Sequence, residues 1–385
     1  MKFAGRMESI APSGTVKIGD RVAELREEGV EVIPFSMGEP DFGTPQHVID
    51  ATIKAMNDGF THYTSSAGIL PLREAVAHKT RTENGIECSA SNVIITPAKF
   101  GIFMSILATI EKGDEIIIPD PSWVSYYQAI RFAGGKPVPV DTTETHYRLH
   151  PDKVAEAITP KTRMIILNSP GNPTGSVATL DELRGIADIA KDHDLIVASD
   201  EIYEKLIFDE KHHSIGSLDG MFERTITVNG FSKSYAMTGW RIGWLVANDD
   251  LIKEILKIQQ HTLTCVTSFV QYGGLEALRG PQDSIPRMVE IFRQRRDLIM
   301  EFLEDIPTLS AEKPEGAFYV FAKYDHDMSS MDMAEYLLNT AHVAMTPGIA
   351  FGPHGEGHLR ISYTTHRQNI ETGMLAIKEA LEKLD

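Results

Sequence analysis

Two cations stand eight positions apart in an otherwise weakly polar stretch of this chain. Lys233 and Arg241 lie within residues 229–243, where most neighbours are small or apolar. Lysine and arginine are almost never fully buried unless they are paired, so the stretch predicts a buried anionic partner. A lysine desolvated beside another cation has a lowered pKa and can act as an amine nucleophile. The alternative is a lysine at a strand end and an arginine whose charge reaches solvent.

Three further polar sites follow short apolar runs. Asn172 comes soon after one run, Asp200 directly after a second, and the segment 96–99 after a third. A buried acid at a strand end is costly unless it is paired. Asp200 therefore predicts a cationic partner, and a helix-capping aspartate is the alternative. The segment 96–99 opens a predicted helix, whose first amide groups, at Ala98 and Lys99, are suited to bind a phosphate.

The elements that must position these groups alternate between strands and helices. Six apolar runs predict strands: 93–95, 115–118, 163–167, 195–198, 225–228 and 242–246. Helical patterns separate several of them: 99–110, 123–133 and 179–192. Short apolar strands that alternate with helices predict an α/β fold with a mainly parallel sheet covered on both faces. In such sheets ligands bind beyond the carboxyl ends of the strands.

The remaining segments predict a second, smaller α+β domain. Near the N-terminus, helices are predicted at 16–29, from the cap Thr44 with Pro45 in the first turn to about residue 56, and at 71–83. Beyond residue 250 the predicted helices are 249–262, 267–279, 284–304, 331–340 and 367–384, with extended segments at 316–321 and 359–362. We assign residues 46–283 to a large domain, and residues 1–45 with 284–385 to a small domain.

Composition and charge exclude several classes of function. The chain has 385 residues and a formal net charge of −17, which argues against nucleic acid and anionic membranes as main partners. An acidic protein that binds an anionic cofactor must concentrate positive charge locally. No apolar run approaches the ~18 residues of a membrane span, and the N-terminus does not resemble a signal peptide. We therefore expect a soluble cytoplasmic protein.

No metal site is predicted. The two cysteines, Cys88 and Cys265, are too few for a disulfide framework or a thiolate metal site. His354 and His358 have the spacing of a metal pair on a helix, but the glycines between them oppose a stable helix. The pair at 212–213 is interpreted as a solvated loop.

Three motifs occur in the order and spacing of one enzyme family. They are NPTG at 172–175, DEIYE at 200–204 and SK-x5-GxRxG at 232–243. Together they resemble the fold-type I aminotransferases of classes I and II. The resemblance extends from Ser13 to Arg360 and is greatest to the prokaryotic aspartate aminotransferase branch, through the further segments 63–68, 123–126 and 316–319. It implies a three-layer PLP-transferase-like fold, the cofactor pyridoxal 5′-phosphate (PLP), and a homodimer with shared active sites.

The resemblance also implies a contact for each part of PLP. Lys233 would attach the cofactor as a Schiff base and move protons during the reaction. Asp200 would hold the ring nitrogen, and Asn172 and Tyr203 the ring oxygen. The remaining contacts would be Trp123 on the ring face and, around the phosphate, Ala98, Lys99, Ser232, Arg241 and Tyr63 from the other subunit. Trp123 as a core residue and Tyr63 as a surface aromatic are the structural alternatives.

The implied substrates are an L-amino acid and a 2-oxo acid that react in a ping-pong sequence. Arg360 would bind the α-carboxylate with help from Gly38, Trp123 and Asn172. Distal-carboxylate recognition would fall to Ser13, Thr15 and Lys99, and this favours aspartate with 2-oxoglutarate. If Lys99 is merely solvated, an aromatic or alanine preference is the alternative. A PLP-dependent carbon–sulfur lyase and a non-catalytic PLP-binding regulator are further alternatives.

Two positions depart from the family pattern. Many relatives carry a serine or threonine three residues before the lysine, where this chain has Gly230, and a glycine in the phosphate loop, where this chain has Pro97. Ser232 is a weaker substitute for the missing hydroxyl. We therefore expect Arg241 and the amides of Ala98 and Lys99 to carry more of the phosphate contact.

Overall fold

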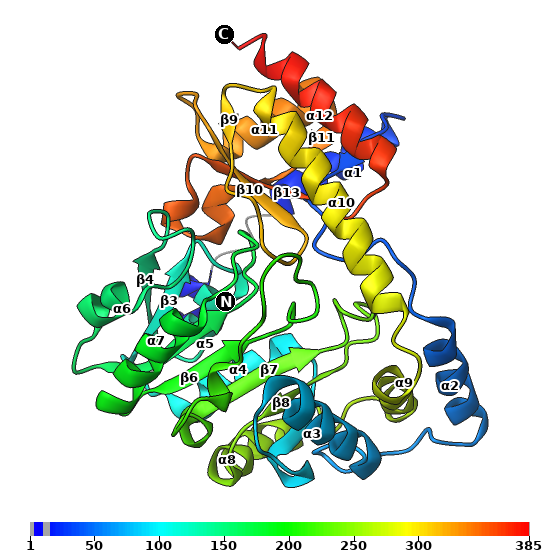
Figure 1. The fold of residues 1–385 in the computed structure, drawn as a ribbon, viewed down its shortest axis with the longest axis vertical. Coiled ribbons are helices and arrows are strands. Elements are labelled where there is room, and N and C mark those ends of the chain that lie inside the picture. The colour runs from blue at the N-terminus through cyan, green and yellow to red at the C-terminus, as the bar shows by residue number, and fades with distance from the viewer. Residues whose placement is uncertain (1–3, 11–15, 385) are drawn as a thin grey trace.

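The computed structural model describes residues 4–10 and 16–384, and its centre is a seven-stranded sheet (Figure 1). In spatial order the strands are β2 (Val93–Ile95), β8 (Gly243–Val246), β7 (Thr225–Gly230), β6 (Ile196–Asp200), β5 (Thr162–Asn168), β3 (Glu115–Asp120) and β4 (Lys136–Asp141). The five strands from β7 to β4 pair in parallel, and β8 alone runs antiparallel to both of its neighbours. The predicted mainly parallel α/β sheet is confirmed.

Helices cover both faces of this sheet because successive strand residues are apolar on both sides. On one face Ile116 and Ile118 of β3 pack with α4 (Ala98–Thr109), α5 (Ser125–Phe132) and α8 (Asp249–His261). On the opposite face Ile117 packs with α6 (Pro151–Ala157) and α7 (Leu180–Asp192). Over β2 and β8 that opposite face is covered by α2 (Gln46–Asn57), α3 (Leu70–Asn84) and α9 (Ser268–Arg279).

A second part of the molecule is built around a four-stranded antiparallel sheet. Its strands, in spatial order, are β12 (Thr346–Pro347), β13 (His358–Ser362), β10 (Tyr319–Tyr324) and β9 (Leu309–Ser310). The helices of this part are α1 (Val16–Glu27), α10 (Ser284–Glu304), α11 (Ser330–Ala341) and α12 (Arg367–Leu381). The short strands β1 (Ile33–Pro34) and β11 (Val343–Ala344) pair in parallel beside it. Figure 1 shows α10 running from this part toward α9.

Short 3₁₀ segments complete the described elements. They are Gly5–Ser9, Ala90–Asn92, Ile215–Ser217, Phe222–Arg224, Gly348–Phe351 and Pro353–Gly355. One hydrophobic cluster joins residues from α1 and β1 to α10, β10, β13, α11 and α12. The N-terminal segment therefore packs with the C-terminal part, and we retain the division into 46–283 and 1–45 with 284–385 as a proposal.

The structure adds two elements to those predicted and corrects one predicted helix cap. Strand β4 and helix α6 were not expected from the sequence. Pro137 and Pro139 obscure the strand pattern of β4, and they are tolerated because β4 is an edge strand; α6 has only seven residues. Thr44 does not cap α2, because its hydroxyl donates to the Ala236 carbonyl at 2.9 Å, and Pro45 occupies the cap position.

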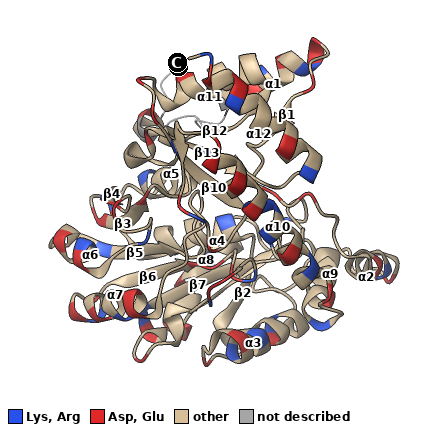
Figure 2. Ribbon diagram, turned by 45° about the horizontal axis from the view of Figure 1, so that its top comes forward, with Lys and Arg blue, Asp and Glu red and all other residues tan. Residues whose placement is uncertain are grey.

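Charged residues of both signs lie mainly on the outer helices, and few lie on strands β5–β7 (Figure 2). Among the described residues, none of the helices combines the length and the apolar character needed to cross a membrane.

Candidate active site

The polar sites predicted from the strand ends meet in one cavity of about 400 Å³. The segments that follow β2, β3, β5, β6 and β7 all reach it, together with residues from β10, β13 and the loop after β1. The predicted site residues in its wall are Gly38, Ala98, Lys99, Trp123, Asn172, Asp200, Tyr203, Ser232, Lys233, Arg241 and Arg360. The wall holds four Lys or Arg side chains against two Asp or Glu side chains, so positive charge is concentrated here in a chain of net charge −17.

Lys233 lies in the turn after β7, with its ammonium group inside the cavity. Its Nζ donates to the Gly38 carbonyl at 2.5 Å, across the gap between the two parts of the molecule. Burial, reinforced by the nearby Arg360 charge, lowers the pKa of Lys233 to about 8. At pH 7 about a tenth of the side chain is therefore neutral, compared with well under a thousandth for an ordinary lysine. This is the state that an amine nucleophile needs.

Asp200 ends β6 and is 6% exposed. Its Oδ2 accepts a hydrogen bond from the Tyr126 hydroxyl at 2.7 Å, and its Oδ1 accepts one from the Ile202 amide at 3.3 Å. Burial raises the pKa of Asp200 to about 6, and the two hydrogen bonds offset part of that rise. A cationic N–H group in the cavity would stabilise the charged carboxylate. Asp200 therefore fits the protonated ring nitrogen of PLP.

Arg360 on β13 is a buried guanidinium without an acidic partner among the described residues, and it is 6% exposed. Its two terminal nitrogens donate to Asn172 Oδ1 at 3.0 Å and to the Ser36 carbonyl at 2.8 Å. Its Nε is buried without a hydrogen-bond partner in the described structure. A buried guanidinium that lacks an anion is suited to bind a carboxylate through its fork of N–H groups.

Asn172 and Tyr203 also line the cavity wall. Because Asn172 Oδ1 already accepts from Arg360, its amide group is left as the donor. The Tyr203 hydroxyl lies 2.9 Å from the hydroxyl of Tyr319, whose ring packs 4.3 Å from the Arg360 guanidinium carbon. Two fixed polar groups are thus available for a ligand oxygen.

The start of α4 offers the cavity an anion site. Ala98 and Lys99 are the first residues of α4, so their amides have no carbonyl of a preceding turn to bond. The Arg241 guanidinium lies exposed at the cavity edge, where its Nη1 donates to the Thr238 carbonyl at 2.8 Å. Ser232 lines the same wall. This donor set fits a phosphate group.

A steric contact explains why position 230 is a glycine. Gly230 of β7 is paired in register with Gly243 of β8. A Cβ atom at Gly230 would lie 2.9 Å from the Gly243 Cα and 3.3 Å from the Ile242 carbonyl oxygen. No side chain fits there unless the backbone moves, so the hydroxyl found in many relatives is replaced by close contact between two strands.

Trp123 and Lys99 form the outer wall of the cavity. The Lys99 ammonium lies 4.9 Å from the centroid of the Trp123 ring, and the ring meets Tyr126 edge to face at 5.3 Å. Partial burial and the charge of Arg241 lower the pKa of Lys99. Lys99 makes no ion pair with any residue that the structure describes, so its charge is available to a ligand.

One predicted site residue that the structure describes does not line this cavity. Tyr63 is 88% exposed in the single chain and does not line the wall. Ser13 and Thr15 lie outside the described residues. The expectation that His212 is solvated was wrong: its side chain is only 11% exposed, and its Nε2 lies 2.9 Å from Glu201 Oε2.

Two residues of the wall were missed by the sequence reasoning. Tyr126 binds Asp200, and Tyr319 supports both Tyr203 and Arg360. Tyr126 lies three positions after Trp123, so the helical spacing at the start of α5 could have indicated that both side chains face the cavity. Tyr319 had no comparable signal, because its pairing depends on how the two parts of the molecule meet.

The fold and the cavity define a class of α/β enzyme in which a reactive lysine lies beside an anion site. The sequence profile "Aminotransferase class I and II" matches residues 30–377. The chain belongs to this family, whose members are PLP-dependent transaminases. The residues of the cavity fit PLP, since the buried acid, the lysine with a lowered pKa and the anion site each match one part of it.

Individual relatives are similar over nearly their whole length. An aspartate aminotransferase of Musicola paradisiaca is 42% identical, and the alignment covers 99% of this chain and 97% of that protein. An aromatic-amino-acid aminotransferase of Thermococcus litoralis is 41% identical, with 100% and 99% covered. The structure of Thermus thermophilus aspartate aminotransferase with maleate has a TM-score of 0.93 at 38% identity, with 99% and 100% covered.

Proposed function

We propose that this transaminase takes the amino group of L-aspartate and passes it to 2-oxoglutarate. The observation that carries the choice of substrate is Lys99, an ammonium group at the cavity wall without an acidic partner among the described residues. Arg360 supplies a second such cation. A substrate with two carboxylates matches both charges, whereas an aromatic amino acid leaves Lys99 unpaired.

The contacts of Arg360 prepare it for the α-carboxylate. Asn172, Ser36 and Tyr319 fix the guanidinium plane before any substrate enters. Preorganisation of this kind reduces the ordering that binding would otherwise require. The Gly38 peptide lies next to it, since a Cβ atom at Gly38 would be 4.0 Å from Arg360 Nη2. The carboxylate end of the substrate is thus held beside Lys233.

Lys233 is the residue placed to hold the cofactor and to move a proton of the substrate. Its lowered pKa leaves part of the amine neutral at pH 7, so the amine can accept the proton from the substrate α-carbon and return it elsewhere. PLP, when bound, supplies an electron sink for the charge that the proton leaves behind. Asp200 would keep the ring nitrogen protonated, and Asn172 and Tyr203 would donate to the ring oxygen.

The proposal includes a homodimer, ping-pong turnover and a cytoplasmic location. Tyr63 supports the dimer, because an aromatic side chain that is 88% exposed in one chain is suited to reach a neighbouring copy. An apolar groove of about 510 Å³, which includes Phe100, Phe132 and Leu263, lies beside the anion site and would be covered by such a copy.

The test is the kcat/KM for a panel of amino donors with 2-oxoglutarate as the acceptor. Aspartate is expected to give the highest value, and glutamate is to appear as the product. A higher value for phenylalanine or tyrosine would favour the aromatic specificity that the name of the Thermococcus litoralis relative suggests. Release of pyruvate or ammonia from cysteine without an acceptor would favour the carbon–sulfur lyase.

A further inference from the structure

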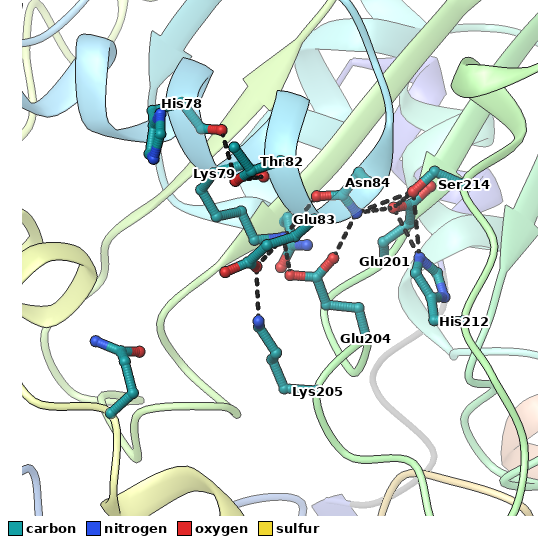
Figure 3. Close-up of polar contacts among 12 residues, drawn as sticks. His78, Lys79, Thr82, Glu83, Asn84, Glu201, Glu204, Lys205, His212 and Ser214 are labelled. Atoms are coloured by element: carbon teal, nitrogen blue, oxygen red, sulfur yellow. Dashed lines mark hydrogen bonds and ion pairs between the residues drawn. The ribbon is translucent and has the colours of Figure 1, made fainter.

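A second polar cluster lies around the turn after β6 (Figure 3), and its residues do not line the cavity. It joins three parts of the chain: Lys79 and Asn84 from α3, Glu201 and Glu204 from the turn after β6, and His212 and Ser214 from the loop that follows. We call these six residues the strand-end network. They are buried or partly buried, and the transfer reaction proposed above assigns no role to them.

Glu201 is the centre of one half of the network. It is 1% exposed. Its Oε2 accepts from the Ser214 hydroxyl at 2.6 Å, lies 2.9 Å from His212 Nε2, and accepts from the Asn84 amide at 3.2 Å. Its Oε1 accepts from the Ser199 hydroxyl at 2.9 Å. A buried carboxylate with this many donors is held in one position.

Glu204 is the centre of the other half. Its Oε1 forms an ion pair with the Lys79 ammonium, and its Oε2 accepts from the Asn84 amide at 2.6 Å. Lys79 also donates to Asn84 Oδ1 at 2.7 Å. Asn84 is the last residue of α3, and Gly85, which ends the helix, adopts a left-handed conformation with φ of 69°. The network therefore ties the turn after β6 to a helix terminus.

The same turn carries the cavity residues on its other side. Asp200 and Tyr203 face the cavity, while Glu201 and Glu204 face α3. Backbone bonds make the turn short: the Glu201 amide donates to the Val228 carbonyl at 2.8 Å, and the Glu204 amide donates to the Glu201 carbonyl at 2.9 Å. A shift of either glutamate would therefore move its neighbour in the cavity.

The network is not arranged as a metal centre. Ligand atoms of Glu201, Glu204 and His212 lie within 4.8 Å of one another, which is close enough for one cation. However, the Lys79 ammonium and the Asn84 amide already bind the Glu204 oxygens. A metal ion would have to displace a buried cation from its carboxylate.

We propose that the strand-end network is a positioning device for the cofactor site, in which Glu201, Glu204 and His212 act as positioning residues for Asp200 and Tyr203. The inference rests on the proposed role of those two residues in binding PLP. Its physical basis is that groups which bind a ligand must be held by partners of their own. Glu201 is held by groups from α3 and from the loop at 212–214, and Glu204 is held by two groups of α3.

Electrostatics supports the same link. The Glu201 charge contributes to the raised pKa of Asp200, although burial of Asp200 is the larger cause. Burial alone would lower the pKa of His212, but Glu201 and Glu204 outweigh this and raise it, against the opposing charge of Lys79. The raised pKa favours the charged form of His212, whose Nε2 faces Glu201 Oε2. Partners such as Lys79 and His212 therefore reduce the negative potential that Glu201 and Glu204 produce at Asp200.

The test compares two carboxylate-to-amide changes at opposite ends of the sheet. Glu204→Gln alters the network. Glu115→Gln alters a carboxylate that is 7% exposed, at the amino end of β3, where it binds Lys136 and Thr159. Titration of each apo-protein with PLP, followed by visible absorbance, gives the dissociation constant of PLP. The visible circular dichroism of bound PLP reports how rigidly the ring is held.

We expect Glu204→Gln to raise the PLP dissociation constant about tenfold and to weaken the circular dichroism signal, which is the effect that supporting residues have at metal ligands. Glu115→Gln is expected to change neither. A Glu204→Gln protein with a lower thermal midpoint but wild-type PLP binding and dichroism would overturn the proposal. Wild-type protein that fails to bind PLP would instead contradict the proposed function.

If Glu204→Gln does not fold, two milder substitutions at His212 test the same proposal. His212→Ala removes the donor to Glu201, whereas His212→Gln keeps an amide that can donate to it. We expect His212→Ala to weaken PLP binding several-fold and His212→Gln to restore most of it. Equal PLP binding by His212→Ala and wild type would overturn the role of His212.

Discussion

Charged groups on the two sides of the turn after β6 differ in whether they have partners within the protein. On the cavity side, Lys99, Arg241 and Arg360 form no ion pair with any described residue. On the α3 side, every carboxylate oxygen of Glu201 and Glu204 accepts a hydrogen bond. An unpaired charge that is removed from water costs free energy, so a group of such charges indicates a ligand-binding site. Charges that are matched indicate a structural role.

The pKa directions separate the two sides in the same way. In the cavity burial prevails: the pKa of Lys233 falls to about 8 and that of Asp200 rises to about 6, both toward the neutral form. In the network burial alone would raise the pKa of Glu204, but Lys79 and His212 outweigh it and lower that pKa to about 2. These shifts fit the reactive role proposed for the cavity and the positioning role proposed for the network.

The largest effect is expected for Lys233→Ala on the cavity side. Lys233 is the group proposed to hold the cofactor and move the proton, so its removal should lower kcat by roughly 10⁴-fold or more. The measurement is glutamate formation from aspartate and 2-oxoglutarate, together with loss of the lysine-bound PLP absorbance. Full activity in this variant would remove the basis of the proposed mechanism.

Arg360→Lys should have the next largest effect. An ammonium group cannot reproduce the planar fork that now bonds Asn172 and Ser36. Loss of a buried charged contact costs about 3 kcal/mol, so kcat/KM should fall roughly 10²-fold for all donors alike. Steady-state kinetics with aspartate and phenylalanine checks this. A loss confined to one donor would contradict an α-carboxylate role.

Glu204→Gln tests the strand-end network through the free energy of unfolding. The folded-state pKa of Glu204 is about 2, below the ~4.3 of an unfolded chain. A depressed carboxyl pKa stabilises the fold above the unfolded value, and this stabilisation is lost as pH falls from about 4 toward 2. The variant should lose about 3 kcal/mol of unfolding free energy at pH 7 and show a flatter acid dependence. Denaturant unfolding at several pH values measures both.

Lys99→Met should have the smallest effect, and a selective one. Lys99 is exposed at the cavity wall, so the fold should be unaffected. We expect kcat/KM for aspartate to fall about tenfold more than that for phenylalanine, because only aspartate would lose a charge partner. Equal losses for the two donors would contradict the assignment of Lys99 to the distal carboxylate. Arg131→Met, near Tyr127 on α5, is a control for removal of a nearby cation.

The part of the site that depends on strand order could be predicted from the sequence. Asn172, Asp200 and Lys233 each follow an apolar strand, and parallel strands end at one edge. Tyr319 and the network could not be predicted, since their partners lie far along the chain and meet only when separate elements pack. His212 is a further case: its neighbours in sequence indicate a solvated loop, but its side chain is only 11% exposed and contacts Glu201.

The glycine pair of β7 and β8 limits how this enzyme can change. A serine at Gly230 would meet the backbone of Gly243 and Ile242, so the hydroxyl common in relatives could be regained only if the two strands moved apart. Selection for tighter phosphate binding would meet a steric barrier at this position and would have to act elsewhere, at Ser232 or around Arg241. The close contact between β7 and β8 thus restricts which substitutions near the phosphate site the protein can tolerate.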